Sequence, residues 1–275
     1  MKKRTYNILI CLFAAIFLVS AGILGKYYYD AYQQQKNYDE LTQLRQKAPT
    51  AARPLLPENA TEQEDIPYKN PLVEIAHPET GEMVVLLEEF AELYQKNPDL
   101  IGWIKIPGVG IDYPVMQKPE KKDYYLNRDF NRKKSSHGCI YVQEESDVFS
   151  PSDNVTIYGH RMKDDSMFGN LDKYLKKSFW KKNPYVYFDT LTGLHTYEII
   201  AVFTTTATKG EGFAYHRFIN AENEKAFDDY VAQCKELAIY DTGITAQYGD
   251  KLITLSTCEY TQTNGRLVIV AKRIA

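Results

Sequence analysis

From residue 102 to the C-terminus, the chain consists of short apolar runs separated by turn residues, and this pattern constrains the fold most. Residues 102–107 and 111–116 flank Gly108 and Gly110, which predicts a hairpin. Runs of this length, rich in β-branched and aromatic residues, are typical of strands. The other expected strands are 139–142, 154–158, 185–189, 196–205, 251–256 and 267–272.

Helical patterns are few and lie between or beside these runs. A helical period over residues 84–94 is closed by Asn97 and Pro98, and shorter helices are expected at 167–175 and 221–237. Strands therefore dominate. The pattern predicts a mainly β fold: a closed or nearly closed eight-stranded β-barrel with peripheral helices, including an N-terminal helix and one before the last two strands.

The N-terminus carries a membrane signal. Lys2, Lys3 and Arg4 precede an apolar run over residues 8–24, which is long enough to cross about 30 Å of hydrocarbon. Basic residues before such a run keep that end in the cytoplasm, so we expect a single-pass membrane anchor with the rest of the chain outside. Residues 19–21 (Val-Ser-Ala) also fit a signal-peptide cleavage site, and that alternative stays open.

Three segments follow from this pattern. We expect a basic end and anchor at 1–25, an extracytoplasmic stalk and proline-rich linker at 26–79, and a folded domain at 80–275. The 33 basic and 36 acidic residues are interspersed and give a net charge of −3. No basic field therefore favours a nucleic-acid partner.

The chain has four cysteines, at positions 11, 139, 234 and 258, and no C-x-x-C pair. Neither a zinc nor a calcium spacing is evident, so no metal and no cofactor are expected. Cys139 and Cys234 fit buried apolar positions of a strand and a helix. Cys258 differs because it follows the strand-like run 252–257 directly.

Cys258, His160 and Arg266 form the candidate catalytic set. An ordinary thiol is only a few per cent ionised at neutral pH, so a nucleophilic cysteine needs a nearby imidazole or cation. His160 follows a predicted strand through Gly159, and Arg266 begins the strand after the Cys258 strand, across a seven-residue loop. A hairpin would place this guanidinium near the sulfur, where it could bind a carbonyl or an oxyanion.

These residues carry a family resemblance. Residues 254–258 (Thr-Leu-Ser-Thr-Cys) followed by Arg266 resemble the T-L-x-T-C…R signature of sortases, and residues 158–160 (Tyr-Gly-His) resemble the sortase histidine motif. The match covers roughly residues 84–275. Residues 167–171 (Met-Phe-Gly-Asn-Leu), the expected helix at 221–237 and the acidic Glu259 are similar to class B sortases in particular.

The resemblance implies a cysteine transpeptidase on a sortase-type barrel. Sortases of Gram-positive cell surfaces cut a C-terminal sorting signal after its Thr, L-P-x-T-G in most classes and N-P-x-T-N/G types in class B. Cys258 would form a thioacyl intermediate, His160 would serve as general acid and base, and Arg266 would hold the oxyanion. The partners would be the sorting peptide and an amine of a peptidoglycan precursor or a pilin lysine. Ser256, Thr257 and Glu259 would line the groove.

Three other interpretations fit the pattern less well. A papain-like peptidase expects its Cys on a helix and ahead of its His, whereas here His160 precedes Cys258. An L,D-transpeptidase has its His and Cys close in sequence, and these are 98 positions apart. A non-catalytic membrane-tethered barrel, with a binding or pilus-structural role, would bury Cys258 and tolerate its loss.

Overall fold

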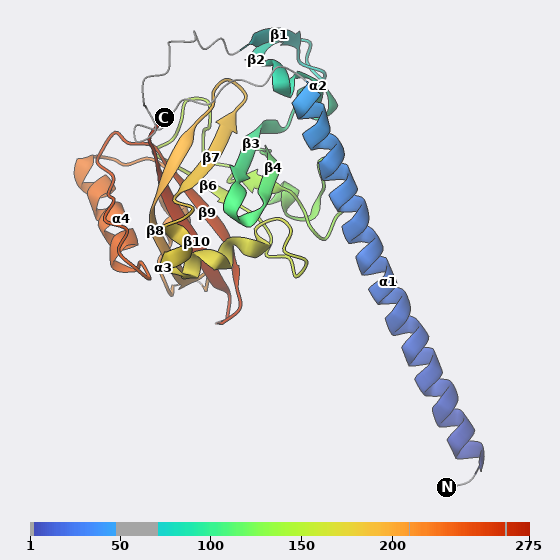
Figure 1. Cartoon of the computed structure of the whole chain (residues 1–275). Coiled ribbons are helices and arrows are strands. Elements are labelled where there is room, and N and C mark those ends of the chain that lie inside the picture. The colour runs from blue at the N-terminus through green and yellow to red at the C-terminus, as the bar shows by residue number, and fades with distance from the viewer. Residues whose placement is uncertain (1–2, 48–70, 209, 262) are drawn as a thin grey trace. The chain divides into compact units, whose positions relative to one another are not determined.

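The computed structural model describes residues 3–47, 71–208, 210–261 and 263–275. The chain divides into two compact units, Met1–Glu40 and Leu41–Ala275. Helix α1, drawn in blue in Figure 1, is continuous over Lys3–Lys47. Its portion from Tyr6 is long and apolar enough to cross a membrane, with a mean hydropathy of 2.7 in the most apolar 18-residue stretch. Most of the proline-rich linker expected within 26–79 lies outside the described residues.

The second unit is built around a closed barrel of eight strands in the order β10-β8-β7-β3-β4-β5-β6-β9. This confirms the eight-stranded β-barrel expected from the sequence. Two neighbouring pairs, β4–β5 and β6–β9, are parallel, and the other pairs are antiparallel. The strands are β3 (Leu100–Ile106), β4 (Ile111–Met116), β5 (Ile140–Val142), β6 (Asn154–Tyr158), β7 (Tyr185–Thr190), β8 (Thr196–Thr206), β9 (Leu252–Glu259) and β10 (Gly265–Arg273).

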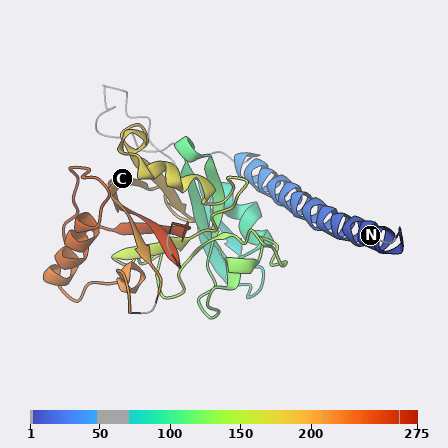
Figure 2. The same cartoon turned by 90° about the horizontal axis from the view of Figure 1, so that it is seen from below.

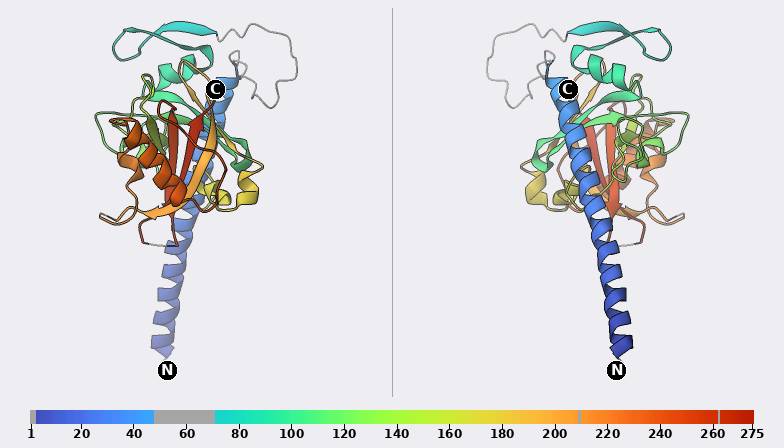
Figure 3. Two further views of the ribbon diagram at one scale, coloured as in Figure 1. Left: turned by 90° about the vertical axis from the view of Figure 1, so that its left-hand side faces the viewer. Right: turned by 90° about the vertical axis from the view of Figure 1, so that its right-hand side faces the viewer.

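A small antiparallel sheet precedes the barrel. Strands β1 (Leu72–Ala76) and β2 (Met83–Leu87) pair with each other only, and Figure 3 shows this hairpin, in cyan, beyond the end of the barrel. Helix α2 (Glu88–Lys96) follows β2 directly. The helix expected over 84–94 is therefore a strand up to Leu87, because Val84 and Leu86 alternate with exposed Met83 and Val85 in a two-residue period.

The remaining helices lie outside the barrel wall. Figures 1 and 2 show α4, in orange, on the outer side of the barrel. Its N-terminus is capped by the Asn223 side chain, which accepts a hydrogen bond from the Ala226 N–H. The helical elements are α3 (Lys177–Trp180), α4 (Glu224–Glu236) and the 3₁₀ turns η2 (Pro107–Val109), η3 (Tyr124–Asn127), η4 (Gly169–Leu175) and η5 (Tyr215–Arg217).

Helix α4 closes a second apolar core against the outer face of the barrel. Phe227, Tyr230 and Cys234 pack in one buried cluster with Phe203 of β8 and Val268 of β10. As a result, β9 and β10 are buried on both faces over most of their length. The partly exposed positions are Cys258 near the end of β9, Arg266 near the start of β10, and Lys272 and Arg273 at the end of β10.

Candidate active site

Cys258 lies near the end of β9, partly exposed and not bonded to another cysteine. In the β9–β10 ladder it is directly opposite Arg266. Directly opposite residues in an antiparallel pair place their side chains on the same face, with Cβ atoms about 4.5–5.5 Å apart. The predicted hairpin is therefore confirmed, and it holds Cys258 and Arg266 side by side.

His160 follows β6, the strand that pairs with the other edge of β9. Strand β6 runs parallel to β9 with Tyr158 beside Ser256, and the Gly159 N–H continues the ladder with a 3.2 Å hydrogen bond to the Ser256 carbonyl. The described pairing ends there, and His160 is two residues past Tyr158, as Cys258 is two residues past Ser256. Cys258 and Arg266 are thus direct neighbours on adjacent strands, and His160 follows the end of the strand on the other side of β9. That the three residues act together stays a prediction.

Gly159 permits this arrangement. A Cβ atom there would lie 2.5 Å from the Ile140 side chain and 2.7 Å from the ring of Phe168. No side chain fits that space without moving the core. After Gly159, the His160 carbonyl accepts a 2.9 Å hydrogen bond from the Phe168 N–H. This bond fixes the backbone at the histidine.

The His160 ring is itself oriented by the main chain. Its Nε2 lies 2.7 Å from the carbonyl oxygen of Leu126, in turn η3. The histidine is partly buried. It is thus held between the end of β6 and the segment that connects β4 to β5.

The Arg266 guanidinium is fixed by the turn that precedes it. Nη1 donates to the carbonyl oxygens of Asn264 at 3.2 Å and Gly265 at 2.9 Å, and Asn264 has a φ of 53°. In the part of the chain that the structure describes, no carboxylate pairs with Arg266. Its charge is therefore available to an anionic group beside Cys258.

The three residues expected to line the groove are all buried. Ser256 shares the face of Cys258, and its hydroxyl lies 2.6 Å from that of Tyr215. Thr257 points to the opposite face, where its hydroxyl donates to the Gly159 carbonyl at 2.8 Å. Glu259 accepts hydrogen bonds from the N–H and hydroxyl of Thr261. Their substrate contacts stay a prediction.

Tyr215 is a neighbour of the site that sequence reasoning missed. Burial raises its pKa, and the nearby Cys258 adds to this, while the Ser256 hydrogen bond and Arg266 oppose it. The hydroxyl is therefore neutral at physiological pH. Burial and the cations Arg217, Lys122 and Arg266 lower the pKa of the adjacent His216. A tyrosine and a histidine in a polar loop give no sequence signal that separates them from surface residues.

Two cavities border this region. One of about 440 Å³ is lined by Tyr158, on the same face of the β6 segment as His160, and by Glu145, His216 and Arg217. The other, about 330 Å³, lies within the loop from Thr206 to Arg217. Both cavities share His216. His160, Cys258 and Arg266 line neither of them; the link to the site is Tyr215, which lines the smaller cavity and contacts Ser256.

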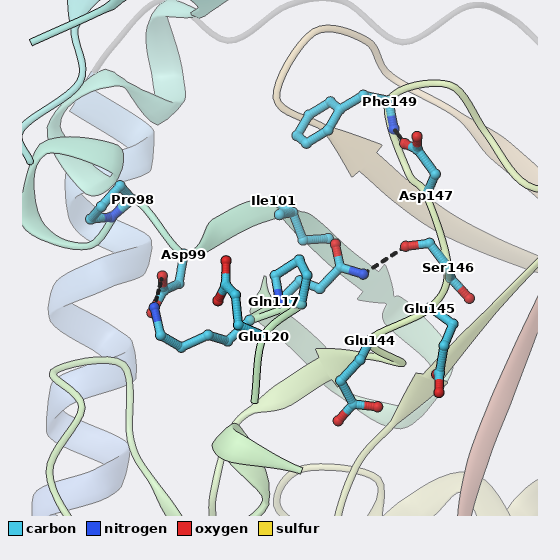
Figure 4. Close-up of a pocket in the computed structure, with 12 residues that line it drawn as sticks. Pro98, Asp99, Ile101, Gln117, Glu120, Glu144, Glu145, Ser146, Asp147 and Phe149 are labelled. Atoms are coloured by element: carbon cyan, nitrogen blue, oxygen red, sulfur yellow. Dashed lines mark hydrogen bonds and ion pairs between the residues drawn. The ribbon is translucent and has the colours of Figure 1, made fainter. Parts of the chain in front are cut away.

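A third cavity, of about 510 Å³, lies elsewhere (Figure 4). Figure 4 shows Gln117 reaching across it to the Ser146 carbonyl, a 2.7 Å hydrogen bond, and the carboxylates of Asp99, Glu120 and Glu144 around it. None of the three catalytic candidates lines it. Among the described residues, no group of His, Cys, Asp and Glu side chains is arranged to hold a metal ion.

A closed eight-stranded barrel with a partly exposed cysteine directly opposite an arginine, and a histidine just after the neighbouring strand, fits a cysteine transpeptidase. A family model described as "Sortase domain" matches residues 104–274. The chain therefore belongs to the sortase family and is a sortase-type cysteine transpeptidase.

Within this family the similarity is to sortase B. Sortase B of Staphylococcus aureus is 34% identical over 68% of this chain and 75% of its own length. The structure of a Staphylococcus aureus sortase B–substrate complex superposes with a TM-score of 0.69 and 28% identity, covering 90% of this chain and 98% of the other. A sortase B complexed with triglycine gives a TM-score of 0.68 and 27% identity over 89% and 98% of the two chains.

Proposed function

We propose that this transpeptidase cleaves the C-terminal sorting signal of secreted surface proteins after its Thr. The product is a thioacyl-enzyme, which then passes the protein to an amine. The observation that carries the proposal is that Cys258 lies directly opposite Arg266, with His160 just after the strand that pairs with the other edge of β9. The relative solved as a substrate complex supports a peptide substrate, and the relative complexed with triglycine supports an amine acceptor.

In the first half-reaction, the Cys258 thiolate attacks the Thr carbonyl carbon. The carbonyl oxygen takes up negative charge, and the Arg266 guanidinium stabilises it. Protonated His160 gives its proton to the leaving nitrogen as the C–N bond breaks. The products are a thioester on Cys258, neutral His160 and a peptide with a free amine.

In the second half-reaction, the acceptor amine attacks the thioester carbon. His160 takes the proton that the attacking nitrogen loses, and the C–S bond breaks to restore the thiolate. The acceptor is an amine of a peptidoglycan precursor or of a pilin lysine. The thiolate–imidazolium pair is regenerated, so no cofactor is consumed.

Helix α1 supports a location at the cell membrane. We propose that its apolar part is a single-pass anchor, with the basic end in the cytoplasm and the barrel outside. Protease treatment of intact cells should then digest the barrel and leave a short anchored fragment. Full protection of the barrel until the cells are lysed would contradict this orientation.

The decisive experiment is intact-mass spectrometry of the full-length protein in detergent micelles, incubated with a panel of sorting peptides. We expect an adduct on Cys258 whose mass ends at the Thr of one peptide and which disappears when an amine is added. Cys258→Ala should abolish the adduct, and His160→Ala and Arg266→Ala should each slow it by about 10²-fold or more. Cys234→Ala is the matched control, because its thiol lies in the α4 core. An adduct that persists in Cys258→Ala would refute the assignment.

A further inference from the structure

We propose that His160 exchanges protons only through Nδ1, and that Gly138 is the positioning residue that enforces this choice. The proposal rests on the function given above. It concerns which atom of the imidazole works and what part of the fold selects it.

The evidence begins with the 2.7 Å contact between His160 Nε2 and the Leu126 carbonyl oxygen. A carbonyl oxygen can only accept, so Nε2 must carry the hydrogen. Neutral imidazole has one N–H, and here it is committed to Leu126. The lone pair is therefore on Nδ1 in the neutral ring, and the proton gained in the imidazolium is also on Nδ1.

The consequence for the reaction is specific. The Cys258 proton moves to Nδ1 when the ion pair forms. Nδ1 then delivers it to the leaving nitrogen as the C–N bond breaks, and later receives one from the attacking amine. The Nε2–H bond to Leu126 stays in place throughout. Transfer through Nε2 would instead require this bond to break in every turnover.

The Leu126 carbonyl is held by bonds on both sides of it. The Tyr125 carbonyl accepts a 3.0 Å hydrogen bond from the Cys139 N–H, and the Asn127 carbonyl accepts one of 3.0 Å from the Ser135 N–H. The carbonyls before and after Leu126 are thus tied to the segment that leads into β5. The carbonyl between them is the one that His160 uses.

Gly138 sits directly against this carbonyl. Its φ is +60°, and a Cβ atom there would lie 2.3 Å from the Leu126 oxygen and 2.7 Å from the Tyr125 oxygen. These are backbone atoms within hydrogen-bonded turn η3, so they cannot rotate aside as a side chain would. A methyl group at position 138 must displace the acceptor of the His160 bond.

Gly110 provides a matched control. Its φ is +71°, similar to that of Gly138, but a Cβ atom there would meet nothing within 4 Å. Gly110→Ala and Gly138→Ala therefore share the strain of a left-handed backbone. Only Gly138→Ala also moves the Leu126 carbonyl.

The first test is nitrogen NMR of the full-length protein in micelles with ¹⁵N-labelled histidine. His160→Gln assigns the His160 signals by their disappearance. We expect neutral His160 as the Nε2–H tautomer in the wild type, and a mixture of tautomers in Gly138→Ala. A wild-type ring that carries its hydrogen on Nδ1 would overturn the proposal, and this measurement needs no variant at position 138 to fold.

The second test is kinetic. We expect Gly138→Ala to lower kcat by about tenfold or more with KM within twofold, while Gly110→Ala stays close to the wild type. The rate of Cys258 alkylation by iodoacetamide at pH 7 should also fall in Gly138→Ala, because the imidazolium loses its carbonyl partner. Equal rates in the two folded glycine variants would refute the role of Gly138.

The experiments can refute the proposed function and the inference about His160 independently of each other. If no sorting peptide acylates the wild type, the proposed function fails, whereas the tautomer and the alkylation rates are still measured. If acylation occurs but His160 carries its hydrogen on Nδ1, only the present inference fails.

Discussion

The Thr257 hydroxyl donates a 2.8 Å hydrogen bond to the carbonyl oxygen of Gly159, the residue before His160. This bond joins β9, at the residue before Cys258, to the main chain at the residue before His160. Arg161, on the other side of His160, lies 4.0 Å from Glu259, and its carbonyl accepts a hydrogen bond from Tyr260. The histidine segment is thus tied to the Cys258 strand on both sides.

Replacing the Thr257 hydroxyl should therefore affect both stability and catalysis. Thr257→Val keeps the shape but leaves a buried carbonyl without its partner, which costs about 1–3 kcal/mol. We expect a lower midpoint in urea and a reduced rate of acylation. Thr257→Ser retains the hydroxyl and should lie close to the wild type in both. Wild-type behaviour of Thr257→Val would show that the bond contributes little.

Arg45 is expected to be essential for the stability of the barrel unit. Its side chain lies 3.1 Å from Glu89 and 3.0 Å from Asp189, whose side chains are only 1% and 2% exposed. It also stacks over the rings of Phe90 and Trp103, at 5.2 and 5.1 Å. Breaking such a buried set costs about 3–5 kcal/mol, so Arg45→Ala should unfold at a markedly lower urea concentration.

Alkaline pH should destabilise the barrel through its buried tyrosines. Burial raises the pKa of Tyr197 to about 12 and raises those of Tyr158 and Tyr215 as well. A pKa that is higher in the folded state stabilises the fold below the unfolded value of about 10, and this stability is lost as pH rises through the folded values. The free energy of unfolding, measured in urea at several pH values, should therefore decrease above pH 10. Tyr197→Phe should lose less of its free energy of unfolding above pH 10 than the wild type does.

Thiol reactivity should separate the cysteines of the barrel unit. Cys139 and Cys234 are buried, and burial raises the pKa of Cys234 to about 12. Iodoacetamide at pH 7 should label Cys258 and leave these two untouched until urea is added, as peptide mapping by mass spectrometry would show. Cys234→Ala should cost stability without slowing acylation. Labelling of Cys234 in the folded protein would show that the α4 core opens readily.

Much of the barrel was predictable because its strands are short runs with clear turn signals. The expected strand at 111–116 coincides with β4, and the hairpin of Cys258 with Arg266 is the β9–β10 pair. Local patterns did not reveal the parallel pairing of β6, which leads to His160, with β9, which carries Cys258. This pairing joins residues about 100 positions apart, so only the motif resemblance indicated it.

Features that depend on the backbone left no sequence signal. The Leu126 carbonyl is a main-chain group, so its role at His160 does not depend on the side chain at that position. Arg45 lies within an otherwise polar helical stretch, and its burial follows from contacts with residues far along the chain. In β2, the helical period at Leu86 and Leu87 also fits a strand, because short apolar runs satisfy both periods.

The parallel β6–β9 pairing joins segments about 100 positions apart, so the candidate site is complete only once both strands are in place. Until that contact forms, no imidazole lies beside the sulfur, and the thiol keeps the low reactivity of an ordinary cysteine. A chain folded only in part would therefore lack the reactive thiol that the proposed reaction needs. The reactive site therefore exists only in the completed barrel.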